Sequence, residues 1–476
     1  MRVVDNSALV IYLVVVLAFG VYAARSNKTA SDYATGGGRL PAWALGLSIF
    51  GTYVSAFSFL ALPGKAYDAN WNAFAFSLAI PVIALLVVKW VVPYYRKLGS
   101  ISAYEHFENR FGPWARIYAV ACYLLIQLGR MGGILYLLAV ALKPITGASI
   151  PALILIASLV VIIYTFFGGM KAVVWTDVLQ SIILIAGAVA CAILIPSSLP
   201  EGTSVLDEPK RFSLGSLEPD LVQSTFWVVL LFGLFENLRN FAADQSYVQR
   251  YQSARDDRAA VRTVWIGALL YLPVSAIFLF IGTSLATYYG SFPDELAPGL
   301  KGDEVFPHYI STALPVGICG LLIAAVASAA QSTVSSSLNC GATLLLNDVY
   351  RRFISPDTDE KQALFFVRVA TVVLGIFGAG AALAMINIKS ALDVWWKIAG
   401  VFGAGILGLY LLGRLTRATS RQAAIATVVG VTVIAGHTYF PVLNPFLTIV
   451  LGTTTIVLIG WGLNGIAGNN RKEFAK

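Results

Sequence analysis

Five hydroxyl side chains fall within six consecutive positions of an otherwise apolar segment, from Ser332 to Ser337. On a helix, Ser332, Ser335 and Ser336 share one face through their i, i+3, i+4 spacing, with Thr333 on its flank. Sodium prefers hard oxygen ligands, which hydroxyls and free backbone carbonyls can supply. Close helix packing through small residues is the alternative interpretation. Because Ala and Gly would satisfy that packing without hydroxyls, we favour a sodium site.

A single arginine, Arg130, lies about halfway along the apolar stretch 113–143. A charge at that depth in a membrane helix is costly and needs a partner. The partner is either a protein acid such as Glu236 or the carboxylate of a substrate, which a guanidinium can bind through two parallel hydrogen bonds. The residues alone leave both open.

Three further polar residues in apolar surroundings have two readings each. Asp177 is either an ion ligand or a charge near a helix end. Ser55 and Ser58 lie one turn apart, after an expected helix break at Gly51-Thr52. Their hydroxyls bind either substrate oxygens or the preceding carbonyls of their own helix, which is the commoner arrangement for a membrane serine.

The composition indicates which elements must position these residues. Of the 476 residues, 58% are hydrophobic and 12% charged, where a soluble domain carries about a quarter charged. We therefore expect an all-α, polytopic membrane protein with about thirteen membrane-spanning helices. The expected helices cover 7–25, 41–66, 72–95, 113–143, 150–167, 173–196, 222–250, 258–288, 307–348, 361–387, 391–413, 420–438 and 443–464.

The helix 41–66 carries Gly51 and Pro63, and the helix 222–250 carries Gly233 before a polar run. Interrupted helices of this kind are typical of transporters built from two inverted repeats around a site at mid-membrane. We expect one transmembrane transporter domain over 1–476. Its repeats would cover 41–196 and 222–413, with an extra helix at 7–25 and two peripheral helices at 420–464.

The net charge of +8 follows from membrane topology. Most Lys and Arg fall in alternate connections, including Arg250, Arg255, Arg258 and Arg262, which are expected to be cytoplasmic. The acidic connections then lie outside, the N-terminus lies outside and the C-terminus is cytoplasmic. The charge is thus accounted for, and we expect no nucleic-acid partner.

Other function classes find little support. The four cysteines lie in apolar helices without paired spacing, as small packing residues do. His106, His308 and His437 form no metal or nucleophile pattern, so we expect no enzyme. A sensor would need a signalling domain and a channel a filter motif, and the sequence contains neither.

At this point the sequence resembles the sodium/solute symporter family, and within it the bacterial sialic acid symporters. The motifs that carry the resemblance are the loop Gly36-Gly37-Gly38-Arg39, the segment 50–58 with Pro63 and Tyr67, the segment 164–169 before Trp175-Thr176-Asp177, Asp244-Gln245 with the segment 248–251, and the serine run 332–337. The resemblance implies a LeuT-like fold, alternating access and function as a monomer.

The resemblance also implies roles for individual residues. One sodium site would use the carbonyls of Gly51, Val54 and Ala329 with the hydroxyls of Ser332 and Thr333. A second sodium site would use Asp177 with Ser332, Ser335 and Ser336. Arg130, Ser55 and Ser58 would bind the substrate carboxylate, in a pocket completed by Tyr53, Ala73, Ser77, Gly233, Glu236 and Asn237.

This pocket departs from that of the sialic acid symporters at four positions. Ser77 stands where they have a glutamine and Ala73 where they have an aromatic residue, while Glu236 and Arg239 replace uncharged residues. The pocket therefore suits either sialic acid, a different acid, or a substrate with an added amino or hydroxyl group.

We therefore expect a bacterial inner-membrane symporter that imports a sugar acid such as sialic acid with one or two sodium ions. The alternatives are a neutral sugar, an amino acid or a monocarboxylate as substrate. A further alternative is coupling to protons instead of sodium, with Glu236 or Asp177 as the proton carrier.

Overall fold

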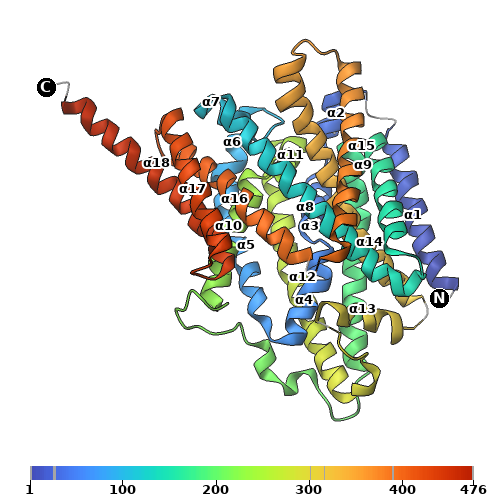
Figure 1. Ribbon diagram of the computed structural model, residues 1–476. Helices are drawn as coiled ribbons and strands as arrows, with labels where there is room; N and C mark the ends of the chain where they lie inside the picture. Colours follow the sequence, from blue (N-terminus) through green and yellow to red (C-terminus); the bar gives the residue numbers. More distant parts are fainter. Residues whose placement is uncertain (1–2, 25–27, 301, 316, 389–390, 474–476) are drawn as a thin grey trace.

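The protein is a bundle of long helices (Figure 1). The computed structural model describes residues 3–24, 28–300, 302–315, 317–388 and 391–473, so residue 25, where the first expected helix ends, lies outside the described residues. Within these ranges the chain forms helices and loops and no β-strand. The predicted all-α fold class is confirmed.

The described residues of the first half of the chain form the helices α1 (Val3–Ala24), α2 (Ala30–Thr35), α3 (Ala42–Tyr53), α4 (Ala56–Asp68), α5 (Phe74–Leu86), α6 (Val92–Leu98), α7 (Glu105–Phe111), α8 (Pro113–Thr146) and α9 (Ile150–Ser197). Those of the second half form α10 (Phe226–Ala243), α11 (Gln245–Ser253), α12 (Asp257–Ser291), α13 (Gly302–Thr312), α14 (Ile318–Leu344), α15 (Glu360–Ala384), α16 (Ala391–Leu415), α17 (Ser420–Tyr439) and α18 (Thr448–Glu473). Short 3-10 turns are η1 (Trp71–Ala73), η3 (Val205–Asp207), η4 (Pro209–Phe212), η5 (Pro293–Glu295), η7 (Met385–Asn387) and η8 (Pro445–Leu447), and π-helical segments are η2 (Val87–Val91) and η6 (Leu345–Ile354).

Among the described residues, 10 helices are long and apolar enough to cross a membrane, or 11 if α3 and α4 form one bent span. The protein is thus a multi-pass membrane protein, as predicted. The predicted number of thirteen stays a prediction, because α9 is 48 residues long yet counts once and the apolar part of α1 is only Ser7–Gly20.

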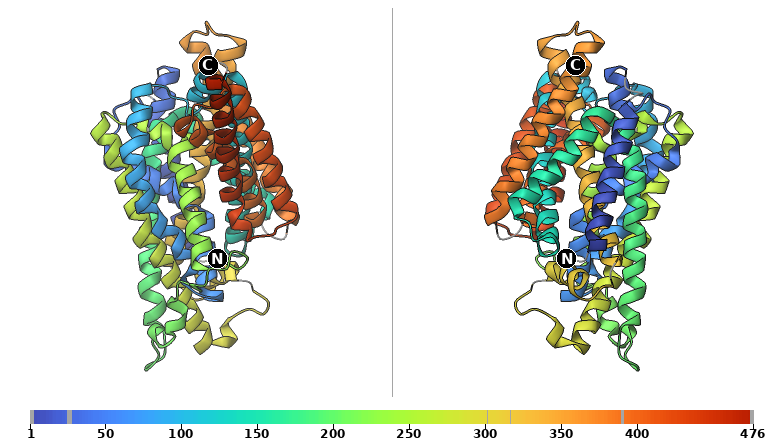
Figure 2. Two further views of the ribbon diagram at one scale, coloured as in Figure 1. Left: turned by 90° about the vertical axis from the view of Figure 1, so that its left-hand side faces the viewer. Right: turned by 90° about the vertical axis from the view of Figure 1, so that its right-hand side faces the viewer.

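The connections separate onto two ends of the bundle. In Figure 1 the short helices α2, α7 and α11 lie at the upper end and α13 lies at the lower end. The side views of Figure 2 show the long helices running between these ends, with the N- and C-termini toward opposite ends. The assignment of these two ends to the membrane faces stays a prediction.

Helix α14 runs through the middle of the bundle and is buried along almost its entire length. It packs against α9, α1, α8, α15 and α3. Its sequence is rich in Ala, Ser and Gly, and such small residues let neighbouring backbones approach closely within a membrane. The serine run of α14 therefore lies where several helices meet.

Two spans are broken, at positions that differ from the expected ones. The α3/α4 pair bends by 56° at Val54 and Ser55, which are extended, and not at Gly51-Thr52. Helix α3 continues because the Val54 amide still donates to the Phe50 carbonyl at 2.8 Å. The α10/α11 pair breaks at Asp244, whose side chain caps α11 by accepting from the Ser246 amide at 2.8 Å.

Two expected helix boundaries also change. The expected helices 150–167 and 173–196 are continuous in α9 except at Gly169, whose φ of 53° and ψ of −152° interrupt the helical path. The expected helix 307–348 is instead divided, since α13 ends at Thr312 and Gly317 has a φ of 89°. Both glycines adopt backbone conformations that side chains disfavour.

Gly169→Ala is expected to destabilise the protein by about 1–3 kcal/mol, because its backbone lies in a region open essentially to glycine alone. A Cβ there would also lie 2.7 Å from the Tyr33 carbonyl oxygen. The measurement is the thermal unfolding midpoint in detergent. Gly436→Ala is the matched control, since a Cβ at that position would meet nothing within 4 Å. Equal midpoints for the two variants would contradict the interpretation.

Candidate functional site

A cavity of about 630 Å³ lies between the two broken spans. Its wall comes from α4, α8, α10, α16 and the turn η8, and includes Gly215 and Ser216 from the long loop between α9 and α10. It also reaches Tyr53 and Asp244, which lie at the breaks of the two spans. The cavity therefore connects one end of the bundle with the two breaks.

Six of the nine predicted substrate-binding residues line this cavity. They are Tyr53, Ser55, Ser58, Ala73, Arg130 and Glu236. Their roles stay predictions, but the fold brings together residues from five separate helical segments, α3, α4, η1, α8 and α10. Ser55 is the extended residue at the break and Ser58 lies on the first turn of α4, so the break itself presents both hydroxyls to the cavity.

The other three, Ser77, Gly233 and Asn237, lie outside the lining. Asn237 is fully buried and accepts a hydrogen bond from the Tyr53 hydroxyl, while its amide donates to the Gly233 carbonyl at 2.7 Å. A Cβ at Gly233 would lie 2.9 Å from the Phe76 backbone. Gly233 and Asn237 thus hold α10 against α5 and α3.

Arg130 contacts a backbone carbonyl and lies near an aromatic ring. Its Nη2 donates to the Thr52 carbonyl at 2.9 Å, and its Nε makes no hydrogen bond. Within the described ranges, no carboxylate forms an ion pair with it. The guanidinium lies 6.0 Å from the ring of Trp395, which stacks on Phe57 at 5.3 Å. The alternative in which Arg130 pairs with Glu236 is wrong.

Glu236 pairs instead with Arg239, three residues further along α10. The two side chains form hydrogen bonds of 2.5 and 3.0 Å, and Arg239 also contacts Asp244 at 3.3 Å. All three residues are buried and line the cavity. A Cβ at Gly403 would lie 2.7 Å from Arg239, so α16 packs directly on this cluster, which is expected to be rigid.

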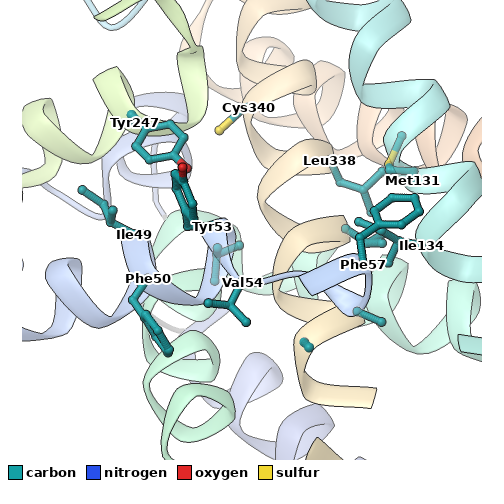
Figure 3. Packing of buried hydrophobic residues seen from close by; sticks show 14 of the residues in the cluster. Ile49, Phe50, Tyr53, Val54, Phe57, Met131, Ile134, Tyr247, Leu338 and Cys340 are labelled. Atoms are coloured by element: carbon teal, nitrogen blue, oxygen red, sulfur yellow. The ribbon is translucent and has the colours of Figure 1, made fainter. Parts of the chain in front are cut away.

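Two predicted ligands of the first sodium site, Gly51 on α3 and Ser332 on α14, lie side by side where these helices approach each other. A Cβ at Gly51 would lie 2.9 Å from the Ser332 hydroxyl and 3.0 Å from the Ser181 hydroxyl. The Thr333 hydroxyl donates to the Ala329 carbonyl at 3.3 Å. Figure 3 shows Val54 on the extended link between the helix of Tyr53 and the turn of Phe57.

Helix breaks leave carbonyl oxygens without intrahelical partners, which makes this junction rich in oxygen. Sequence reasoning missed Ser181, which its i, i+4 spacing from Asp177 could have revealed.

The predicted second sodium site surrounds a fully buried carboxylate, Asp177. One oxygen accepts from the Ser332 hydroxyl at 2.6 Å, and the other accepts from the Ser48 hydroxyl and from Arg250 Nη2 at 3.1 Å. The Ser335 hydroxyl instead donates to the Ser332 carbonyl at 3.0 Å.

Arg250 was expected in a cytoplasmic connection, but it lies on helix α11 instead. Its side chain is fully buried, because α11 turns it inward toward Asp177. Rotation of α11 about the break at Asp244 sets this direction, and the sequence carries no signal for it.

Taken together, the site offers a cavity with the guanidinium of Arg130, which is unpaired among the described residues, beside two buried clusters of oxygen atoms. Within the parts of the chain that the structure describes, no group of three or more His, Cys, Asp or Glu side chains could hold a metal ion. An arrangement of this kind can bind an anionic solute in the cavity and a hard monovalent cation beside it. These features define a membrane transporter of small solutes.

Comparison with known proteins agrees with this class. The model of the Sodium:solute symporter family matches residues 33–430, so the chain belongs to this family. It is 34% identical over 457 residues to the sodium/sialic acid symporter SiaT of Proteus mirabilis, covering 94% of this chain and 92% of that protein. It is 32% identical over 463 residues to the sodium/sialic acid symporter NanT of Aliivibrio fischeri, covering 95% of this chain and 91% of that protein.

Solved structures show the same fold. A substrate-bound, outward-open Na+-coupled sialic acid symporter with a novel Na+ site matches with a TM-score of 0.93 at 33% identity, covering 98% of both chains. The nucleobase-cation symporter Mhp1 in a closed conformation matches with a TM-score of 0.58 at 17% identity, covering 92% of this chain and 94% of that chain, which shows the fold alone. The protein thus has the LeuT-like architecture of these transporters.

Glu236→Gln is expected to destabilise the protein by about 3 kcal/mol, because removing one partner leaves the buried Arg239 charge poorly compensated. The double variant Glu236→Gln/Arg239→Gln should recover much of this loss. Thermal unfolding midpoints of both single variants and the double variant give the coupling. Additive losses would show that the two side chains do not act as a pair.

Proposed function

We propose that the protein is a sodium-coupled symporter that imports a sugar acid, with sialic acid as the best candidate. The observation that carries the proposal is Arg130, whose guanidinium lies in the wall of the central cavity and forms no ion pair with any acid that the structure describes. A partly buried cation without a counter-charge is unfavourable in a membrane protein, and a carboxylate-bearing substrate supplies that counter-charge. Ser55 and Ser58 lie in the same cavity wall. The sialic acid symporters SiaT and NanT support the choice of substrate.

Sodium coupling is supported by the family and by the oxygen-rich junction of α3, α9 and α14. The first ion would be held by the carbonyls of Gly51, Val54 and Ala329 with the hydroxyls of Ser332 and Thr333. This ion would fix the α3/α4 break against α14, and thereby hold Ser55 and Ser58 in the cavity wall.

A second ion would be held by Asp177 with Ser332, Ser335 and Ser336. Its site adjoins the first, since Ser332 belongs to both sets and donates to Asp177 at 2.6 Å.

The alternatives receive less support from the contacts. Glu236 is an unfavourable proton carrier because Arg239 holds both of its oxygens. Asp177 is likewise paired, with Arg250. A neutral sugar would leave Arg130 without a counter-charge. An amino acid or a monocarboxylate would neutralise it but would fill less of a cavity of about 630 Å³.

We further propose a bacterial inner-membrane location, with the N-terminus outside and the C-terminus cytoplasmic. The cavity then opens toward the outside, because its lining includes Gly215 and Ser216 of the α9–α10 loop. The protein would move the solute without converting it chemically. It would do so as a monomer with a single transporter domain of two inverted repeats.

The driving force can be estimated for two sodium ions and one monoanion. A tenfold sodium gradient contributes about 1.4 kcal/mol per ion, and 100 mV contributes about 2.3 kcal/mol for the one net charge moved. The sum of about 5 kcal/mol would support accumulation of several thousand-fold. Rocking of the broken spans against α14 toward the inward-facing state would separate the junction of α3, α9 and α14, and would release ions and solute together.

Arg130→Ala is expected to lower uptake of sialic acid into proteoliposomes at least about a hundredfold, because a charge-assisted bidentate contact is lost. Uptake is measured with radiolabelled substrate under an inward sodium gradient. Lys143→Ala, an exposed cation at the end of the same helix, is the control and should retain uptake. Undiminished uptake by Arg130→Ala would refute binding of the substrate carboxylate by Arg130. Equal uptake in sodium-free buffer would refute sodium coupling.

Asp177→Asn is expected to lower the Hill coefficient for sodium in the same assay from about two to about one, since a neutral amide binds a hard cation poorly. Thr333→Val removes a ligand of the first site only and should raise the sodium concentration for half-maximal uptake about tenfold or more. An unchanged Hill coefficient in Asp177→Asn would remove the second ion from the proposal.

A further inference from the structure

The carboxylate of Asp177 already has a cation beside it, the guanidinium of Arg250. The two side chains are fully buried and lie 3.1 Å apart. Arg250 makes further hydrogen bonds to oxygen atoms of α3, α11 and α14: the hydroxyls of Ser48 at 2.9 Å, Thr52 at 2.7 Å and Ser336 at 2.7 Å, and the carbonyl of Ser246 at 2.6 Å. One side chain therefore satisfies oxygen atoms from four helices.

Two of these oxygen atoms belong to the proposed second sodium site. A single nitrogen, Arg250 Nη2, contacts both Asp177 Oδ2 and Ser336 Oγ. A hard cation bound by the same two oxygens at about 2.4 Å would take nearly the position of that nitrogen. The guanidinium and the ion cannot both occupy it.

The charges lead to the same conclusion. With Arg250 in place the pair is neutral, and a sodium ion would add an uncompensated positive charge in a buried environment, which is strongly unfavourable. Arg250 forms no other ion pair in the described parts of the chain. With Arg250 withdrawn, Asp177 alone balances one sodium ion, and the local charge is again zero.

We propose that Arg250 is a tethered competitor of sodium at the second site, so that the guanidinium and the ion bind Asp177 and Ser336 in alternation. This inference rests on the proposed sodium coupling. Arg250 is a positioning residue: it lowers the affinity of the second ion and fills the oxygen cluster when the ion is absent. The protein can then return without sodium and without a bare buried carboxylate.

The exchange would also affect how α11 is held. With sodium absent, Arg250 ties α11 to α3, α9 and α14. With sodium bound, α11 keeps the contacts of Gln249, whose amide donates to the Ala34 carbonyl at 2.5 Å and to Asn339 at 2.8 Å. Ion binding thus loosens one of two anchors of the second broken span and leaves the other in place.

The test is a sodium titration of the purified protein at fixed ionic strength, followed by equilibrium binding of radiolabelled sodium. Arg250→Gln removes the charge and keeps a hydrogen-bonding amide. It is expected to bind the second sodium ion at least about tenfold more tightly than the unmodified protein, and Asp177→Asn in the same background should abolish the gain. A merely structural arginine would give the opposite result, since its loss would weaken ion binding.

Thr52→Val provides a second variant that retains Arg250 and all proposed sodium ligands. It removes one acceptor of the guanidinium, so the second ion should bind about threefold more tightly. Arg116→Gln is the matched control, because Arg116 is also buried and paired with a carboxylate, Asp348, at 2.6 Å. This variant should lose stability without any gain in sodium affinity.

Unchanged or weaker sodium binding in both Arg250→Gln and Thr52→Val would overturn the competition. A protein that binds no sodium in any form would instead overturn the proposed function, so the two failures are distinguishable. A comparable gain in Arg116→Gln would also contradict the inference, since it would show a general effect of losing a buried charge.

Discussion

A carboxylate in the interior of a membrane-spanning bundle must be neutralised, and much of this structure is organised around that requirement at Asp177. Hydroxyls from α3 and α14 donate to it, and a guanidinium from α11 lies beside it. Because these groups come from distant parts of the sequence, their convergence fixes how the broken spans lie against α14. The same oxygen atoms that stabilise the bundle are those a sodium ion would use.

Each of the two broken spans contacts both the solute cavity and the oxygen-rich region around Asp177. At the α3/α4 break, Ser55 and Ser58 line the cavity while the preceding turn, with Gly51, contacts Ser332. At the α10/α11 break, Glu236 and Arg239 line the cavity while Arg250 reaches the oxygen cluster. Each break therefore connects the solute cavity with the ion region within one or two helical turns. Coupling between ion binding and solute binding can therefore act directly through these two breaks.

The sequence predicts the membrane fold, the positions of most spans and the chemistry of α14, because composition and hydrophobic length decide these. Glu236 and Arg239 have the i, i+3 spacing of a helical ion pair, so their pairing was also predictable. The exact break near Val54 was not, since glycine at position 51 permits either a helix or a break. The inward direction of Arg250 depends on how α11 rotates after Asp244, and no local pattern encodes that rotation.

Phe57 of α4 stacks on Trp395 of α16, and the Trp395 ring lies beside the guanidinium of Arg130. Phe57 lies only two residues beyond the extended link, so its ring follows any change in the angle of that link. An ion that makes the link rigid would thereby also fix the positions of the Phe57 and Trp395 rings before a solute binds. Arrival would then be ordered, with the ion first, and the residence time of the solute would lengthen as the ion concentration rises.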